Sequence, residues 1–433
     1  MAYTQDGYPA ELANKIGHVK LIQDPMIERL VEAWEDCRPP REIDLPAPTA
    51  HIDLDGVGPV KQVITVDGGH QVVPNIVLPE RQVGFVQVAA QLVHMDTLDF
   101  LNAHPMADPR EVRQTLSRFT HHTLAAIPVA GIHIPGQTTR ESIRDAVHRF
   151  LRHYELYDGL SYLVYRSWQD AIGDPPSMEC VRCGRPFVLE RYAVRFSCPA
   201  CREQHTLSDY LGLCQRDAED RSTAETVSNL RSVLELLVLF SLIIKFRDRS
   251  PIMDHTLFLL DGPLLLRAQL SRLVEPIRAL VSDQTHRGLN LYLVGVEKTG
   301  TFRSFADVIG RRLDSPGDYY VPSTQYVLEN IQGRSFDPAT YRNRVNYGAK
   351  VVLRAGTNHV LALDVPTGDY ILEPKPRDLI GFPETAVALA RLVSYRFENA
   401  LIPLVLANSE ASISNQPSGG LLAQFVERVL AHE

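Results

Sequence analysis

Four cysteines in two close pairs constrain the fold of this chain more than any other feature of its sequence. They follow the pattern C-x2-C-x14-C-x2-C, at Cys180, Cys183, Cys198 and Cys201. Each C-x-x-C turn points two thiolates at one ion, and a hairpin between the turns brings the second pair across. Because four thiolates leave no position open for water, the sequence predicts a structural Zn²⁺ ion in a small inserted zinc ribbon.

Composition indicates a globular intracellular protein. The chain has 433 residues, 45% of them hydrophobic and 22% charged, which suits roughly two or three structural units and argues against disorder. The first residues show no secretory signal, so the cysteine pairs indicate a metal rather than disulfides. The most apolar window, 234–244, is about half the length that crosses a bilayer and contains Glu235. We therefore expect a cytoplasmic protein without a membrane segment.

Apolar periodicity predicts an α/β fold, in which a mixed sheet is flanked by helices. Buried strands are predicted at 62–66, 84–93, 256–260 and 291–296, with a hairpin at 350–365. Helices are predicted at 22–37, 110–125, 141–157, 224–246, 264–282, 384–396 and 420–431. Changes in composition divide the chain into an N-terminal arm or packing segment (1–60), a first part of the core with a helical insertion (61–175), the zinc ribbon (176–207) and a second part of the core (208–433).

Two of the predicted strands each end in Asp-Gly, at Asp67 and Asp261. Aspartates at the carboxyl ends of buried strands lie at the rim of an α/β sheet, where ligands bind. Glu235 is a lone carboxylate in an apolar helix, and its burial costs several kcal/mol unless it is paired or bound to a cation. It can pair with Arg231, or it can join Asp67 and Asp261 in holding Mg²⁺ or Mn²⁺, which prefer oxygen ligands.

Basic residues mark two further positions. Lys298 follows the strand predicted at 291–296 and can hold a phosphate there, or it is an exposed loop lysine. Between Cys180 and His205 there are five arginines (182, 185, 191, 195 and 202) against Glu190 and Glu203. These arginines can contact nucleic-acid phosphates, or they can form a solvated face of a small packing module, and the sequence favours neither alternative. The chain as a whole carries a net charge of −8, which weighs mildly against a nucleic-acid-binding protein.

Several short motifs, taken in order along the chain, resemble the NurA nucleases. They are VDGG at 66–69, LEL at 234–236, LDGPL at 260–264, VGVEKTG at 294–300, HVLALDVP at 359–366 and IPLVLANSEASIS at 402–414. The resemblance covers about 61–96 and 224–415, and the cysteine module interrupts it. It implies a metal-dependent DNA nuclease with an RNase H-like core, working with a HerA-type hexameric ATPase.

The resemblance also assigns roles to individual residues. Asp67, Glu235 and Asp261 match the family's metal-binding acids, and Asn408 stands where the family often has a histidine. An asparagine can ligate a cation or bind phosphate, but it is no general acid or base near neutral pH. Glu297 replaces the family's usual serine at the end of its strand, and adds an acid or a salt-bridge partner near the site.

The sequence therefore predicts a nuclease that cuts DNA with Mn²⁺ or Mg²⁺ at Asp67, Glu235 and Asp261, helped by Lys298 and Asn408. The resemblance implies a homodimer docked on the ATPase, acting in DNA repair or antiviral defence. A non-catalytic subunit that guides DNA, and an Argonaute-like nuclease with the same type of core, are the alternatives. No Walker loop, GxGxxG or GxSxG motif supports a small-molecule enzyme.

Overall fold

The computed structural model describes residues 24–32, 48–74, 80–103, 120–168, 175–214, 223–339, 341, 344–393, 400–414 and 418–430. The chain divides into two units, Met1–Asp44 and Leu45–Glu433. In the first unit, helix α2 (Pro25–Glu32) lies inside the segment predicted to be helical. All of the sites described below belong to the second unit.

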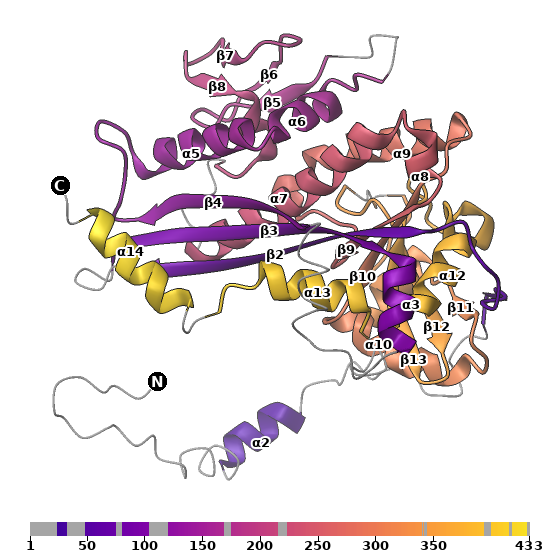
Figure 1. Cartoon of the computed structure of the whole chain (residues 1–433). Coiled ribbons are helices and arrows are strands. Elements are labelled where there is room, and N and C mark those ends of the chain that lie inside the picture. Colours follow the sequence, from indigo (N-terminus) through magenta and orange to yellow (C-terminus); the bar gives the residue numbers. More distant parts are fainter. Residues whose placement is uncertain are drawn as a thin grey trace. The chain divides into compact units, whose positions relative to one another are not determined.

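Nine strands of the second unit form one mixed sheet in the order β1-β11-β12-β13-β10-β9-β2-β3-β4 (Figure 1). Strands β2, β9 and β10 run parallel, and every other neighbouring pair is antiparallel. The strands are β1 (Ala50–His51), β2 (Gln62–Pro74), β3 (Gln82–His94), β4 (Thr120–Ala130), β9 (Thr256–Asp261), β10 (Tyr292–Glu297), β11 (Asp318–Tyr320), β12 (Ala349–Gly356) and β13 (His359–Val365).

Helices cover both faces of this sheet, because its central strands bury apolar side chains on both sides. Ile64 and Val66 of β2 face a core shared with α5, α6, α7 and α9, whereas Val63 faces one shared with α3, α12 and α13. The helices are α3 (Met95–Ala103), α5 (Thr139–His153), α6 (Leu156–Val164), α7 (Thr223–Phe246), α8 (Ser250–Met253), α9 (Val274–His286), α10 (Thr301–Ile309), α11 (Thr324–Tyr326), α12 (Phe382–Leu392), α13 (Ile402–Ala411) and α14 (Gly420–Leu430). Short helical turns are η2 (Leu207–Leu211), η4 (Ala268–Leu273), η5 (Gly310–Arg312), η6 (Val327–Ile331) and η7 (Pro376–Asp378).

The long apolar helix predicted at 224–246 is α7, which packs against β2 and β3. Among the described helices it alone is long and apolar enough to cross a membrane, and 67% of its most apolar window is buried inside the protein. It is thus the central helix of the core. The strands predicted at 256–260 and 291–296 and the hairpin at 350–365 are also present, as β9, β10 and the β12–β13 pair.

Three sequence predictions of local structure are wrong. Residues 120–125, predicted as the end of a helix, lie in strand β4. Alternate side chains from Thr123 to Ile127 are buried there, which is the period of a strand. Residues 110–119, the start of the predicted helix, lie outside the described part of the chain. The helix predicted at 264–282 begins only at Val274. The segment before it is held by a distant contact, since the Leu264 N–H donates to Asp364 at 2.8 Å.

The third error concerns the end of the first strand, which the sequence predicts at Asp67-Gly68. Strand β2 continues through these residues to Pro74, and both glycines pair with β3. Their missing side chains instead let two helices approach the strand. A Cβ on Gly68 would lie 2.5 Å from Glu235 Oε1 of α7, and one on Gly69 would lie 2.2 Å from the Ala411 carbonyl oxygen of α13.

Candidate functional site

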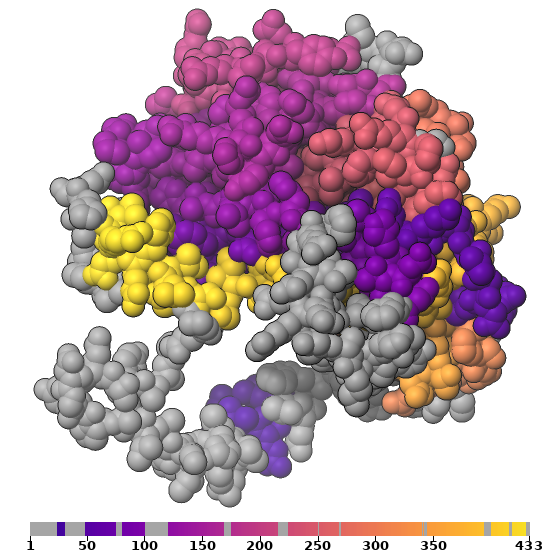
Figure 2. Space-filling model, in the orientation of Figure 1, coloured from indigo at the N-terminus to yellow at the C-terminus, as the bar shows by residue number. Residues whose placement is uncertain are grey.

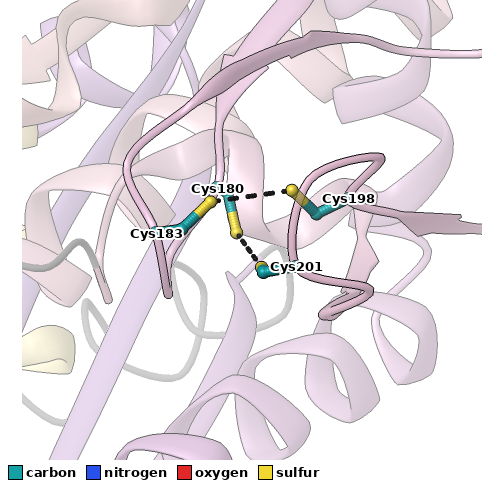
Figure 3. A group of neighbouring side chains, drawn as sticks. All are labelled: Cys180, Cys183, Cys198 and Cys201. Carbon is teal, nitrogen blue, oxygen red and sulfur yellow. Dashed lines mark hydrogen bonds between the residues drawn. The ribbon is translucent and has the colours of Figure 1, made fainter.

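The four predicted cysteines form one compact cluster. The sulfur atoms of Cys180 and Cys201 are 3.5 Å apart, those of Cys183 and Cys198 are 3.7 Å apart, and all four lie within 4.8 Å of one another. Figure 3 shows the side chains converging from two separate turns. A tetrahedral ion with bonds of about 2.3 Å would space its thiolates by about 3.8 Å. The cluster is therefore the right size to bind one metal ion such as zinc.

The two C-x-x-C turns have matching backbones. The Gly184 N–H donates to the Cys180 carbonyl at 2.9 Å, and the Arg202 N–H donates to the Cys198 carbonyl at 2.9 Å. Gly184 and Arg202 both take positive φ angles, 74° and 64°. Each turn lies in its own short hairpin, formed by β5 (Ser177–Glu179) with β6 (Pro186–Val188) and by β7 (Arg195–Ser197) with β8 (Gln204–Thr206).

A network of buried polar groups anchors the cluster to α5. The His205 Nε2 atom lies 3.3 Å from Cys180 Sγ, and the other ring nitrogen lies 3.4 Å from Asp209. Arg144 of α5 donates to both oxygens of Asp209 at 2.8 Å and to Glu203 at 2.9 Å. Burial opposes ionisation of Asp209, but the hydrogen bonds from Arg144 and His205 outweigh it and lower its pKa to about 2.

A second cluster lies in the sheet, where the structure brings Asp67 and Asp261 together. The parallel pairing of β2 with β9 ends at Val66 and Leu260, so the two aspartates are the next residues on adjacent strands. Asp67 is only 4% exposed. Its burial, and next the negative charge of Asp261, raise its pKa to about 7, although Lys298 and the Gly68 backbone lower it.

The Asp67 carboxylate is only partly satisfied. Its Oδ1 atom accepts from the Gly68 N–H at 2.7 Å, whereas the buried Oδ2 atom has no hydrogen-bond partner in the described structure. Lys298, which follows β10, places its Nζ atom 2.6 Å from Asp261 Oδ2. Three parallel strands and the residue that follows the third therefore supply the two acids and one base of this site, and the Asp67 and Asp261 carboxyl groups are close enough to share a proton in a hydrogen bond.

Glu235 reaches the same region from α7, on the Gly68 side of β2. It is 6% exposed, its Oε1 atom lies 3.6 Å from Arg231 Nη1, and that oxygen has no hydrogen-bond partner among the described residues. Burial raises its pKa to about 8; Arg231 acts against this, and Asp67 and Asp261 add to it. In the described part of the chain the four cysteines are close enough to hold one ion, whereas Asp67, Asp261 and Glu235 do not form such a group.

The remaining predicted residue, Asn408, lies on α13 with an exposed side chain. The helix packs against β2 and β3, and at its end the Ala411 carbonyl faces Gly69. The structure therefore brings Asp67, Asp261, Lys298 and Glu235 into one region, and presents Asn408 to solvent on a neighbouring helix.

Lys350 is a half-buried lysine beside this site that no sequence pattern predicts. The Lys350 Nζ atom of β12 contacts Glu297 Oε1 and lies 3.0 Å from Asp364 Oδ1. The same Asp364 carboxylate accepts from the Leu264 N–H, which fixes the loop that follows Asp261. Burial, and next Asp364, raise the pKa of Glu297, while Lys350 lowers it. Glu297 and Asp364 are thus engaged with Lys350, whereas Asp67 and Glu235 each keep one buried carboxylate oxygen that accepts no hydrogen bond from a described residue.

No protein-family model matches the sequence, and no curated protein matches it either. Among solved structures the chain is similar to the crystal structure of the NurA nuclease from Sulfolobus solfataricus. The match covers 98% of this chain and 99% of that chain, at 11% sequence identity and a TM-score of 0.37. A likeness at this level decides nothing by itself, so function has to be inferred from the residues of this chain.

Proposed function

We propose that this protein is a divalent-metal-dependent deoxyribonuclease of the NurA type. The observation that carries the proposal is the placement of Asp67 beside Asp261, on parallel strands, with one buried carboxylate oxygen of Asp67 unpartnered. Two adjacent carboxylates repel each other unless a proton or a cation lies between them. An arrangement that raises the pKa of Asp67 to about 7 is therefore suited to a cation.

The donor set fits Mg²⁺ or Mn²⁺. Carboxylate oxygens are the hard ligands that these ions prefer, and Asp67 and Asp261 would hold the ion. Glu235 would become the third acid only when its carboxylate moves closer to the ion, because the three acids do not lie within reach of one position in the structure. Such an ion, when bound, activates water and stabilises the charge that develops in phosphodiester cleavage. Lys298 now neutralises Asp261 at 2.6 Å; beside a bound cation its ammonium group is free to hold a DNA phosphate.

Asn408 has a lesser role in this proposal. Its exposed amide on α13 can donate a hydrogen bond to the DNA backbone, and it cannot exchange a proton near neutral pH. The five strands β4-β3-β2-β9-β10 combine an antiparallel half with a parallel half. This mixed arrangement, with α7 packed across β2, supports the RNase H-like core that the resemblance implies.

The proposal includes a HerA-type hexameric ATPase as partner, a homodimeric nuclease, a cytoplasmic location, and a role in DNA end processing or in defence against foreign DNA. A motor that feeds DNA into the site removes the need for a strongly basic surface, which suits a chain of net charge −8. If the motor is needed, cutting of long duplex DNA will require ATP and the partner, while short single strands will be cut without them. Equal cutting of long duplexes by the lone protein would contradict the partnership.

A cleavage assay tests the enzymatic proposal. The purified protein should cut labelled DNA when Mn²⁺ or Mg²⁺ is added and not when both are omitted. Asp67→Asn and Asp261→Asn should each reduce the rate by at least about 100-fold, since each removes a charge that the ion needs. The matched control is Asp55→Asn, at an exposed aspartate that precedes β2.

Two results would count against this function. Unchanged cleavage by Asp67→Asn would place the chemistry elsewhere or in a contaminant. A wild-type protein that binds DNA and never cuts it, with any of these ions and with the partner present, would favour the non-catalytic guiding subunit instead. The observation that favours this second function is that Asn408 is exposed and cannot serve as an acid or base.

A further inference from the structure

The cysteine module, residues 176–207, carries a surface that the proposed catalytic site does not use. Within residues 185–195 the arginines 185, 191 and 195 are all exposed. Three large side chains lie between them and are also exposed, Val188 at 61%, Tyr192 at 62% and Val194 at 47%. We call this stretch the ribbon surface. Basic side chains interleaved with an aromatic ring are the combination that binds single-stranded nucleic acid.

The positive charge of the module is largely unneutralised on this side. Two of its glutamates are engaged by arginines of the core: Glu203 with Arg144 at 2.9 Å, and Glu179 with Arg272 at 3.3 Å. By contrast, the arginines 185, 195 and 202 form no ion pair with any described residue. Within the ribbon surface one exposed acid, Glu190, faces three exposed arginines, so a protein of net charge −8 has a local excess of guanidinium groups here. Guanidinium binds phosphate well.

Tyr192 is held in an unusual way. Its φ of 62° is a left-handed conformation, which is strained for an aromatic residue. Its ring lies 5.5 Å from that of Tyr165, and the Arg191 guanidinium lies 5.1 Å from the ring centroid. Tyr165 is itself fixed, because its hydroxyl donates to the Glu190 carbonyl at 3.2 Å. The Tyr192 ring is thus pre-oriented and yet 62% exposed, and its burial does not explain the strain.

The module has a separate face for packing. Phe187, Leu189 and Phe196 are at least 90% buried and belong to the same core as α5, α6 and α7. Because side chains alternate along a strand, their neighbours Val188 and Arg195 point away from that core. Apart from the contact of Tyr192 with Tyr165, the ribbon surface is therefore not used to attach the module, and its arginines remain available to a ligand.

We infer that the ribbon surface binds single-stranded DNA, with Arg191 and Arg195 on phosphates and Tyr192 stacked on an unpaired base. Stacking on a protein ring requires a base that has left its duplex, which favours a single strand over a double one. The inference rests on the proposed nuclease function for the choice of DNA as the polyanion. The ribbon surface would give an acidic protein a place to hold its DNA substrate at a distance from Asp67 and Asp261.

Because of where the cysteine module lies, DNA binding should depend on the length of the strand. In Figure 1 strands β5 to β8 lie outside α5 and α6, with this helical layer between them and the sheet, and Figure 2 shows the atoms of the module exposed beside α5. A strand that touches both the ribbon surface and Asp67 must pass around that layer. Long oligonucleotides can therefore use both sites, and short ones only one.

Binding should be measured by fluorescence anisotropy with 30-mer and 8-mer oligo(dT), at several salt concentrations. The full chain carrying Asp67→Asn is used without divalent ions, so that nothing is cut. Arg191→Ala with Arg195→Ala should weaken 30-mer binding at least about tenfold and lower the slope of log Kd against log salt by about 1.4, since two phosphate contacts are lost. Tyr192→Ala should weaken it by roughly tenfold with no change of slope, whereas Tyr192→Phe should bind like the parent.

Three controls make the test decisive. Zinc content and melting temperature show that each variant keeps its module, and Arg191→Lys with Arg195→Lys keeps the charge if the alanine pair fails to fold. Arg377→Ala removes an arginine that is 82% exposed on another part of the chain and should leave binding unchanged. Equal 30-mer binding by the parent, Tyr192→Ala and the double variant would overturn the inference.

The outcome is separable from that of the proposed function. Loss of binding in the ribbon variants, with a wild-type protein that never cuts DNA, would support the ribbon surface and contradict the nuclease. Unaltered binding in the variants, with Mn²⁺-dependent cutting by the wild type, would contradict the ribbon surface alone.

Discussion

The cysteine cluster and the Asp67–Asp261 pair are two potential metal sites built in opposite ways. The cysteines lie within one short stretch, on two small hairpins whose turns face each other across the place of the ion. The aspartates come from distant segments, and the pairing of β2 with β9 positions them whether or not an ion is present. In the first site the ligands hold the local fold together, whereas in the second the fold forces the ligands together against their repulsion.

The largest effect is expected from breaking the first site. Cys183→Ser should remove the metal and with it folding free energy on the order of 10 kcal/mol, giving insoluble or partly unfolded protein. The matched control is Cys214→Ser, at a buried cysteine outside the cluster. Metal content and melting temperature are the measurements; a metal-free protein that melts like the wild type would show that the cluster has no structural role.

A substitution in the second site should have the opposite effect on the stability of the fold. Asp67→Asn removes a buried charge that Asp261 repels, so without divalent ions the variant should be as stable as the wild type or more stable by about 1 kcal/mol. Added Mn²⁺ should raise the melting temperature of the wild type and not of the variant. A variant that melts far below the wild type would mean that Asp67 supports the fold rather than a ligand.

The pH dependence of stability sharpens the same contrast. The pKa values of Asp67 and Glu235 are raised to about 7 and about 8, so the folded state keeps protons that the unfolded state has already lost. Stability without divalent ions should therefore fall as pH rises from about 5 to about 8. Chemical denaturation at both pH values measures this, and Asp67→Asn with Glu235→Gln should show a smaller fall. An equal fall in both proteins would assign it to other groups.

The same difference explains what the sequence could predict. Cysteine spacing is local, so it specified the compact cluster at Cys180 to Cys201 that the structure contains. The strands carrying Asp67 and Asp261 are recognisable as apolar runs, but the sequence predicts that the first ends at Gly68, because only the packing of α7 explains why this residue lacks a side chain. The contact of Lys350 with Glu297 and Asp364 depends on strand pairing far along the chain, and no local pattern predicts it.

The smallest effect concerns Glu235, which the sequence left between a metal site and a pair with Arg231. The 3.6 Å separation and the unpartnered Oε1 atom describe a weak pair. At about pH 5, where Glu235 is protonated in the folded state, Glu235→Gln should therefore change stability by less than about 1 kcal/mol, and it should reduce the response to Mn²⁺ at higher pH. If Glu235 mainly serves Arg231, Glu235→Ala should cost about 3–5 kcal/mol and leave the Mn²⁺ response intact. Thermal melting of both variants with and without Mn²⁺ distinguishes these outcomes.

The most direct test of the central claim, that Asp67 and Asp261 form a divalent-cation site, is a calorimetric titration of Mn²⁺ into the full chain at pH 8. Wild-type protein and Asp55→Asn should bind Mn²⁺ alike, Asp67→Asn and Asp261→Asn should each bind at least about tenfold more weakly, and binding should weaken toward pH 6 as protons compete for Asp67. Mn²⁺ binding that is equal in all four proteins, or absent from the wild type, would contradict the account.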